Sequence, residues 1–187
     1  FTQLEGADLI LGVEMQSTGE VACFGRNFFD ALSKAMISAG YNIPRRGGNI
    51  LVTVGGQSMK RKILPLVGML RELDYNIIST EHTSEFLTDN RVSNVTTVFK
   101  IAEPDRKPNI ADYILNGSLD LIINIPQSSA IEKYADMLED EYVIRRRSVE
   151  LGIPVLTNIE TATVFIKSLE WIRSNKPTVD FHTANIS

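Results

Sequence analysis

Five short apolar runs that alternate with longer stretches of helical spacing constrain the fold of this chain more than any other feature. The runs occupy residues 50–54, 77–80, 95–99, 119–124 and 155–157. Most are continuous in apolar and β-branched residues, as expected for strands covered on both faces. Helical spacing falls at residues 60–73, 83–88, 109–116, 140–151 and 160–173. This order predicts a three-layer α/β domain with a five-stranded parallel sheet flanked by helices.

A break in composition at residues 43–48 separates this domain from what precedes it. The sequence there is Ile-Pro-Arg-Arg-Gly-Gly, which is typical of a linker or a sharp entry into a new domain. Before the break, Phe28, Leu32 and Met36 recur at helical spacing, and the pattern ends at Gly40. We therefore expect a mainly helical or irregular segment with its linker at residues 1–46, the α/β domain at 47–175 and a polar tail at 176–187.

Composition and charge argue against several classes of function. A formal charge of −4 lacks the basic excess of a nucleic-acid or membrane-surface binder, so neither partner is expected. Cys23 is the sole cysteine and has no histidine near it in sequence to act as a base, so no catalytic thiol is expected. No Cys, His and carboxylate cluster has metal-ligand spacing, and no run has the length of a membrane span. Because the first residue is Phe, we expect a piece of a longer polypeptide.

The residues that directly follow the runs are polar and include two lysines. In a parallel α/β sheet these positions gather at the carboxyl ends of the strands, where such folds bind ligands. The turn at residues 55–60 leads into a helix whose free N–H groups, with Lys60 beside them, suit an anion. Thr80 and Thr83 add hydroxyl donors for phosphate oxygens, Lys100 adds a second positive charge, and Asn124 suits a ribose or a base edge. Together they predict an anion site.

Each of these residues also has a plain structural interpretation. Thr80 would be a strand-end residue and Thr83 an N-cap, since Ser, Thr, Asp and Asn commonly precede helices. Lys60 and Lys100 would be solvated surface lysines, and Asn124 would cap a loop. The run of three arginines at residues 145–147 is more typical of a solvated helix face than of a site. Only the convergence of the other residues on one sheet edge favours a binding site.

Three stretches resemble carbamoyl phosphate synthetases. The opening stretch at residues 12–25, GVEMQSTGEVACFG, strongly resembles the end of the second ATP-grasp half of their large subunit. The remainder, with VIRR at 143–146 and GIPVLTN at 152–158, resembles the methylglyoxal-synthase-like domain that follows it. The resemblance implies a regulatory, non-catalytic domain that binds an effector and holds no cofactor, within a parent ligase that uses ATP and Mg. Implied partners are the ATP-grasp core and a glutaminase, and a homo-oligomer is left open.

The resemblance also implies a set of effector-binding residues. The matched positions are Lys60, Thr80, Thr83, Lys100, Asn124, Val143 and Ile144. In nucleotide-regulated members, the counterparts of Lys60, Thr80 and Thr83 meet phosphate. The counterpart of Asn124 lies near sugar and base there, and those of Val143 and Ile144 line the base. Two lysines favour a uridine nucleotide (UTP or UMP), with phosphoribosyl pyrophosphate as a further candidate.

One branch of the family gives an alternative effector. N-acetylglutamate-regulated, urea-cycle members carry a tryptophan near the position of Lys100, where this chain has the lysine. Some other members have a threonine where this chain has Pro126, whereas the urea-cycle branch shares the pattern Asn124-x-Pro126. N-acetylglutamate therefore stays the alternative. The nucleotide interpretation implies a cytoplasmic parent in pyrimidine synthesis, and the alternative implies a mitochondrial one.

Two other classes of function remain to be weighed. A true methylglyoxal synthase needs a carboxylate base with a histidine nearby, and family enzymes carry a His-Asp pair after the first strand. Here the turn at residues 55–60 has neither, and no carboxylate follows Asn124, so we expect no catalytic residue. Alternatively, the domain supports assembly, because segment 1–44 is apolar and would pack on the rest of a synthetase. Assembly and effector sensing are compatible.

Overall fold

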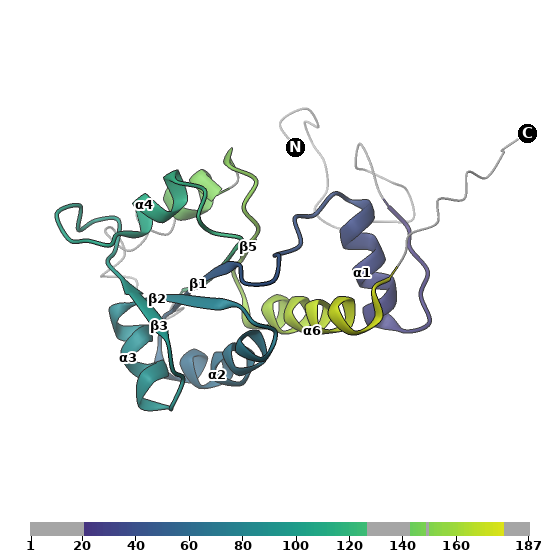
Figure 1. The fold of residues 1–187 in the computed structure, drawn as a ribbon, viewed down its shortest axis with the longest axis horizontal. Helices are drawn as coiled ribbons and strands as arrows, with labels where there is room; N and C mark the ends of the chain where they lie inside the picture. Colours follow the sequence, from purple (N-terminus) through teal and green to yellow (C-terminus); the bar gives the residue numbers. More distant parts are fainter. Residues whose placement is uncertain (1–20, 127–142, 149, 178–187) are drawn as a thin grey trace, which may run out of the picture.

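A computed structural model of the 187-residue chain describes residues 21–126, 143–148 and 150–177. Its centre is a five-stranded, all-parallel sheet with the strand order β3-β2-β1-β4-β5 (Figure 1). The strands are β1 (Asn49–Val54), β2 (Asn76–Thr80), β3 (Val95–Val98), β4 (Leu121–Ile125) and β5 (Val155–Leu156). All five apolar runs form strands, which confirms the predicted fold class.

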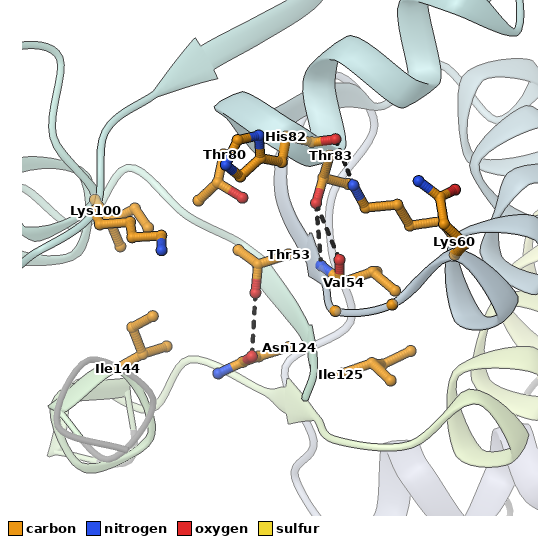
Figure 2. Close-up of a pocket in the computed structure, with 14 residues that line it drawn as sticks. Thr53, Val54, Lys60, Thr80, His82, Thr83, Lys100, Asn124, Ile125 and Ile144 are labelled. Atoms are coloured by element: carbon orange, nitrogen blue, oxygen red, sulfur yellow. Dashed lines mark hydrogen bonds between the residues drawn. The ribbon is translucent and has the colours of Figure 1, made fainter. Parts of the chain in front are cut away.

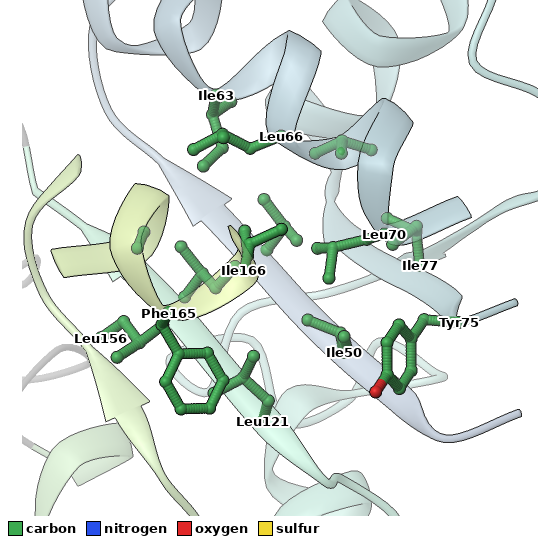
Figure 3. Close-up of a cluster of buried hydrophobic side chains, with 14 of the residues drawn as sticks. Ile50, Ile63, Leu66, Leu70, Tyr75, Ile77, Leu121, Leu156, Phe165 and Ile166 are labelled. Carbon is green, nitrogen blue, oxygen red and sulfur yellow. The ribbon is translucent and has the colours of Figure 1, made fainter. Parts of the chain in front are cut away.

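Helices cover both faces of the sheet, because the strands carry apolar side chains on both sides. One face packs against α2 (Gln57–Glu72), α3 (Glu81–Asp89) and α6 (Ile159–Asn175). The other packs against α4 (Ile110–Leu115) and the helical residues described within 143–150. Strand β1 shows the division, since Ile50 and Val52 enter the first core cluster and Leu51 enters the second. Figure 3 shows the first cluster, with Ile50 labelled. Successive side chains of a strand point to opposite faces.

The order of the strands reverses direction between β1 and β4. From β1 the chain builds outward through β2 and β3, and then returns to place β4 on the other side of β1. The register across this switch pairs Thr53 with Asn124. A topological switch point leaves a crevice outside the carboxyl ends of the strands, which is where open α/β sheets bind ligands.

The helix before the break in composition packs against the α/β domain. This helix, α1 (Phe28–Ser38), lies beside α6 (Figure 1), and Met36 belongs to the main core cluster. Phe24 and Phe28 are 88% and 61% exposed. The connection after α1 is held to the domain, because Tyr75 Oη donates to Pro44 O at 2.8 Å and Asn42 Nδ2 donates to Gly152 O at 2.8 Å. The domain boundary expected after residue 46 stays a prediction. Residues 12–20 of the stretch that resembles an ATP-grasp half lie outside the described residues.

The described helices and the arginine run can be compared with what the sequence predicts. None of the described helices is both long and apolar enough to cross a membrane. Arg146 and Arg147 are exposed and form ion pairs with Glu150 at 3.2 and 3.7 Å, as expected for a solvated helix face. Arg145 is half-buried, so the expectation does not hold for the first arginine of the run.

Candidate functional site

A cavity of about 460 Å³ opens at the carboxyl ends of the central strands, at the switch point (Figure 2). Its volume lies within the usual range for small-molecule sites. The described residues that line it include six of the seven predicted site residues. The lining consists of Thr53, Val54, Gly55, Gly56, Gln57, Lys60, Thr80, His82, Thr83, Lys100, Ile110, Asn124, Ile125 and Ile144.

Lys60 belongs to the first turn of α2, and only 8% of it is exposed. Its ammonium donates a hydrogen bond to His82 O at 2.6 Å and lies 5.9 Å from the centre of the Phe86 ring. Burial lowers the pKa of Lys60, and the nearby Glu85 carboxylate opposes that shift. The surface-lysine interpretation is therefore wrong for Lys60. Within the described part of the chain the ammonium has one acceptor, so two of its three N–H donors are open there to a ligand at the cavity wall.

Lys100 approaches the same cavity from the opposite wall. It follows β3, is exposed, and directs its ammonium toward the cavity in Figure 2. Its backbone is fixed, because Asn109 Nδ2 donates to Lys100 O at 2.5 Å. Asn109 is 1% exposed and also caps α4. The backbone of Lys100 is therefore held in place, whereas its side chain is in solvent.

Thr80 and Thr83 differ in the roles that the structure gives them. Thr80 ends β2 and holds the N-cap position of α3 without a side-chain capping bond, so its hydroxyl faces the cavity (Figure 2). The prediction that Thr83 is an N-cap is wrong, because α3 begins at Glu81 and Thr83 lies inside it, 2% exposed. Thr83 Oγ1 donates to Val54 O and accepts from Val54 N, both at 3.3 Å. The Thr83 hydroxyl therefore joins α3 to β1, and its proton is already used in that hydrogen bond.

Two helix N-termini meet at this cavity. Gly56 precedes α2 with a φ of +73°, a left-handed conformation that glycine adopts without strain. The lining includes Gly56 and Gln57 at the start of α2, and Thr80 and His82 at the start of α3. The first N–H groups of a helix have no partner within it, and the helix dipole adds a partial positive charge there. Both helix starts therefore favour an anion in the cavity.

Asn124 contributes a buried donor that has no partner among the described residues. It lies within β4, is 2% exposed, and its Oδ1 accepts a hydrogen bond from Thr53 Oγ1 at 3.1 Å. Its Nδ2 is buried and has no hydrogen-bond partner within the described part of the chain. In Figure 2 this nitrogen is turned toward the side of Ile144. A buried unpaired donor is costly, so the amide is suited to an acceptor atom of a ligand. The loop-cap interpretation of Asn124 is wrong.

The remaining wall is apolar. Ile144, 4% exposed, and Ile110 come from the helices on one face, and Ile125 ends β4. Val143 is half-buried and is not among the described lining residues, so only Ile144 of the predicted pair faces the cavity. The cavity thus joins a cationic, donor-rich side to an apolar side. No carboxylate appears among the described lining residues.

Sequence reasoning missed three lining residues, Thr53, Val54 and Ile110. Thr53 interrupts an apolar run one residue before its end, and such a polar residue in a buried strand is the signal that could have found it. Ile110 gives no signal, because it is one of many isoleucines with core spacing. No group of three His, Cys, Asp or Glu side chains gathers as metal ligands would, among the residues the structure describes.

Fold and cavity together define a parallel α/β domain with a cavity at its switch point that is lined in part by two lysines. The family model of the MGS-like domain matches residues 62–157, and the chain belongs to this family. The matched stretch contains five of the predicted site residues on the cavity wall: Thr80, Thr83, Lys100, Asn124 and Ile144.

Individual relatives match almost the whole chain. Multifunctional protein ura1 of Schizosaccharomyces pombe is 35% identical over 98% of this chain and 8% of that protein. Multifunctional protein CAD of Squalus acanthias is 34% identical over 100% of this chain and 9% of that protein. The human mitochondrial carbamoyl-phosphate synthase [ammonia] is 36% identical over 96% of this chain and 12% of that protein. The chain therefore spans about a tenth of the length of these relatives.

Proposed function

We propose that this chain is the non-catalytic regulatory domain of a carbamoyl phosphate synthetase, and that it binds a small anionic effector in the switch-point cavity. The observation that carries the proposal is the convergence of Lys60, Lys100 and two helix N-termini on that one cavity. Two ammonium groups and several unpartnered N–H groups stabilise phosphate or carboxylate oxygens. The likeness to a carbamoyl-phosphate synthase supports the identity of the parent.

A uridine nucleotide, UTP or UMP, is the effector that this cavity favours, with phosphoribosyl pyrophosphate as a further candidate. The cationic side offers donors for phosphate, and Asn124 offers a buried N–H donor for a sugar or uracil oxygen. The apolar wall of Ile144, Ile110 and Ile125 provides a surface for a base. Such an effector would place the parent in pyrimidine synthesis.

N-acetylglutamate is the second candidate, and a specific observation favours it. A mitochondrial synthase that carries "ammonia" in its name is 36% identical, as similar as the multifunctional proteins are. The pattern Asn124-x-Pro126 agrees with the urea-cycle branch. An effector with two carboxylates and an amide would also use the cationic wall and Asn124 Nδ2. It would leave the apolar wall less filled, because it has no aromatic base.

From the side chains that line the cavity, we propose that this chain catalyses no reaction. Removing a carbon-bound proton needs a base within hydrogen-bond reach of the substrate. The described lining offers His82 as its one histidine and no Asp or Glu. His82 is largely exposed and lies 3.5 Å from Glu85. We therefore expect no release of methylglyoxal from dihydroxyacetone phosphate by this chain.

The route from cavity to partner is proposed to run through α6 and α1. Helix α6 begins just after β5, at the cavity edge of the sheet, and packs against α1 farther along (Figure 1). An effector that shifts α6 would move α1 and with it the contact to the remainder of the synthetase. Couplings of this kind are typically about 1–3 kcal/mol, or about 5–150-fold in linked affinity.

Calorimetric titration of the chain with UTP, UMP, phosphoribosyl pyrophosphate and N-acetylglutamate tests the proposal. We expect a uridine nucleotide to bind, and Lys60→Ala to weaken it. Lys62→Ala is the matched control, because Lys62 lies on the same helix with its side chain exposed and outside the described lining. Binding of N-acetylglutamate alone would establish the second candidate. Silence from all four ligands would refute the effector role.

A further inference from the structure

Arg106 forms a contact that joins two separate walls of the cavity. It lies in the connection between β3 and α4, residues 99–109, and its guanidinium donates to both carboxylate oxygens of Glu81, at 2.8 and 3.1 Å. It also donates to Glu103 Oε2 at 3.1 Å, and its central carbon lies 3.8 Å from the centre of the Phe99 ring. A bidentate, ring-stacked arginine has a well-defined geometry, unlike an isolated surface ion pair.

Each end of this contact is next to residues that line the cavity. Glu81, the first residue of α3, stands between Thr80 and His82 in the sequence, and both of those line the cavity. Phe99, on which Arg106 stacks, directly precedes Lys100. Neither Glu81 nor Arg106 is a lining residue, so they act on the cavity through their neighbours.

Hydrogen bonds within the connection hold residues 99–109 together. Asn109 Nδ2 donates to Lys100 O and to Glu103 O, and the Phe99 N–H donates to Pro108 O at 2.8 Å. Residues 99–109 therefore behave as one body. Ser84 and Thr97 join α3 to β3 at 2.7 Å between their hydroxyl oxygens, so the strand stays in place without Arg106. The pair of Arg106 and Glu81 adds a direct contact between this connection, which carries Lys100, and the first residue of α3.

We propose that Arg106 and Glu81 form a clip that positions Lys100 opposite the N-terminus of α3, so that one anion contacts both walls. Both are positioning residues, and neither touches the ligand. The affinity part of the proposal rests on the proposed effector function, whereas the mechanical part does not. The two parts are therefore measured separately.

The mechanical part is tested without a ligand, by amide hydrogen exchange. The Glu103 and Arg106 N–H groups donate to Lys100 O and Glu103 O and report on the connection. We expect Glu81→Ala to speed their exchange by roughly fivefold, because opening of the connection becomes easier. Glu81→Ala is the cleaner variant, since it leaves the contact of Arg106 with Glu103 in place. Lys107→Ala is the matched control, because Lys107 pairs with Asp112 and no described contact joins it to α3.

For Glu81→Ala, the proposal predicts a change in UTP affinity whose direction the loss of charge alone would not produce. Removing the negative charge of Glu81 beside an anion site would tighten UTP binding by simple electrostatics. For Glu81→Ala the clip predicts the opposite, a loss of about threefold. Arg106→Ala should show a similar loss, and neither variant should lose more affinity when it is added to Lys100→Ala. Lys107→Ala should leave the affinity unchanged.

Three results would overturn the clip. These are unchanged amide exchange in Glu81→Ala, tighter UTP binding by that variant, or an equal loss in the Lys100→Ala background. If exchange responds as expected but the wild-type chain binds none of the four effectors, the clip stands and the proposed effector function fails.

Discussion

The two lysines of the cavity resemble each other in sequence and differ in almost every physical property. Each comes shortly after a strand of the sheet. Lys60 is 8% exposed, grows from a sixteen-residue helix, and donates to His82 O at 2.6 Å. Lys100 is exposed, belongs to an irregular connection, and is fixed through its backbone by Asn109. Lys60 is part of the cavity wall, whereas Lys100 reaches toward the cavity from solvent.

The difference assigns the two lysines different physical roles. A buried ammonium is already desolvated and ordered, so little extra conformational entropy is lost when it meets an anion. An exposed lysine loses side-chain freedom on binding, and salt screens its charge. Lys60 should therefore set the strength of anion binding. Lys100 should add a smaller contribution that depends on ionic strength and on its placement by Arg106.

Replacing Lys60 should have the largest effect. Lys60→Met keeps most of the side-chain volume and removes the charge, and we expect it to weaken UTP binding by about 10–100-fold, in the range of a charged hydrogen bond. Calorimetric titration at low salt measures the change. Thermal unfolding of the same variant should show a small shift, because methionine still packs near Phe86 while the His82 carbonyl loses its donor. Equal affinities for Lys60→Met and the wild type would break the comparison.

Replacing Lys100 should cost less and should change the salt dependence. We expect Lys100→Ala to weaken UTP binding by about 2–5-fold at low salt, as for an exposed ion pair. The deficit should shrink as salt rises to about 1 M, where the screening length falls to about 3 Å. Titrations at several salt concentrations measure it. A larger loss for Lys100→Ala than for Lys60→Met would reverse the assigned roles.

The sequence was enough to predict the fold, because hydrophobic periodicity is a local signal. All five apolar runs became strands of one parallel sheet, and α6 buries Ala162, Phe165 and Ile166 as the spacing required. The convergence of polar residues was predicted too, since topology places all carboxyl ends at one edge. The packing of α1 against α6 was not predicted, because no local pattern states what an apolar face will meet.

The sequence could not assign the hydrogen-bond state of the individual side chains. Thr83 looked like an N-cap, but α3 begins two residues earlier and its hydroxyl joins β1 instead. Lys60 and Lys100 gave the same signal, although one is buried and one is exposed. The contact of Arg106 with Glu81 spans 25 residues, and nothing local marks it. Such features depend on tertiary placement, which a single sequence does not state.

The smallest expected effect is a difference between the two lysines in how they make UTP affinity depend on pH. Burial lowers the pKa of Lys60 below its ordinary value of 10.5, so it loses its proton earlier than a solvated lysine as pH rises. A bound phosphate favours the charged form. Affinity for UTP should therefore stay level below the lowered pKa of Lys60 and fall as pH rises through it. Titrations from neutral pH up to the ordinary value of 10.5 measure the fall, which should be larger in the wild type and in Lys100→Ala than in Lys60→Met.

Without ligand, Lys60 should make the free energy of unfolding rise with pH, whereas it makes the affinity for UTP fall. Between its lowered folded pKa and its unfolded value, the unfolded chain binds more protons than the folded one, so this residue makes stability rise with pH. The cost of burying the charge is present in full at neutral pH and is relieved as Lys60 deprotonates. The difference in unfolding free energy between wild type and Lys60→Met should then change in favour of the wild type as pH approaches 10.5. A difference that stays constant over that range would mean that Lys60 is solvated, and the contrast with Lys100 would disappear.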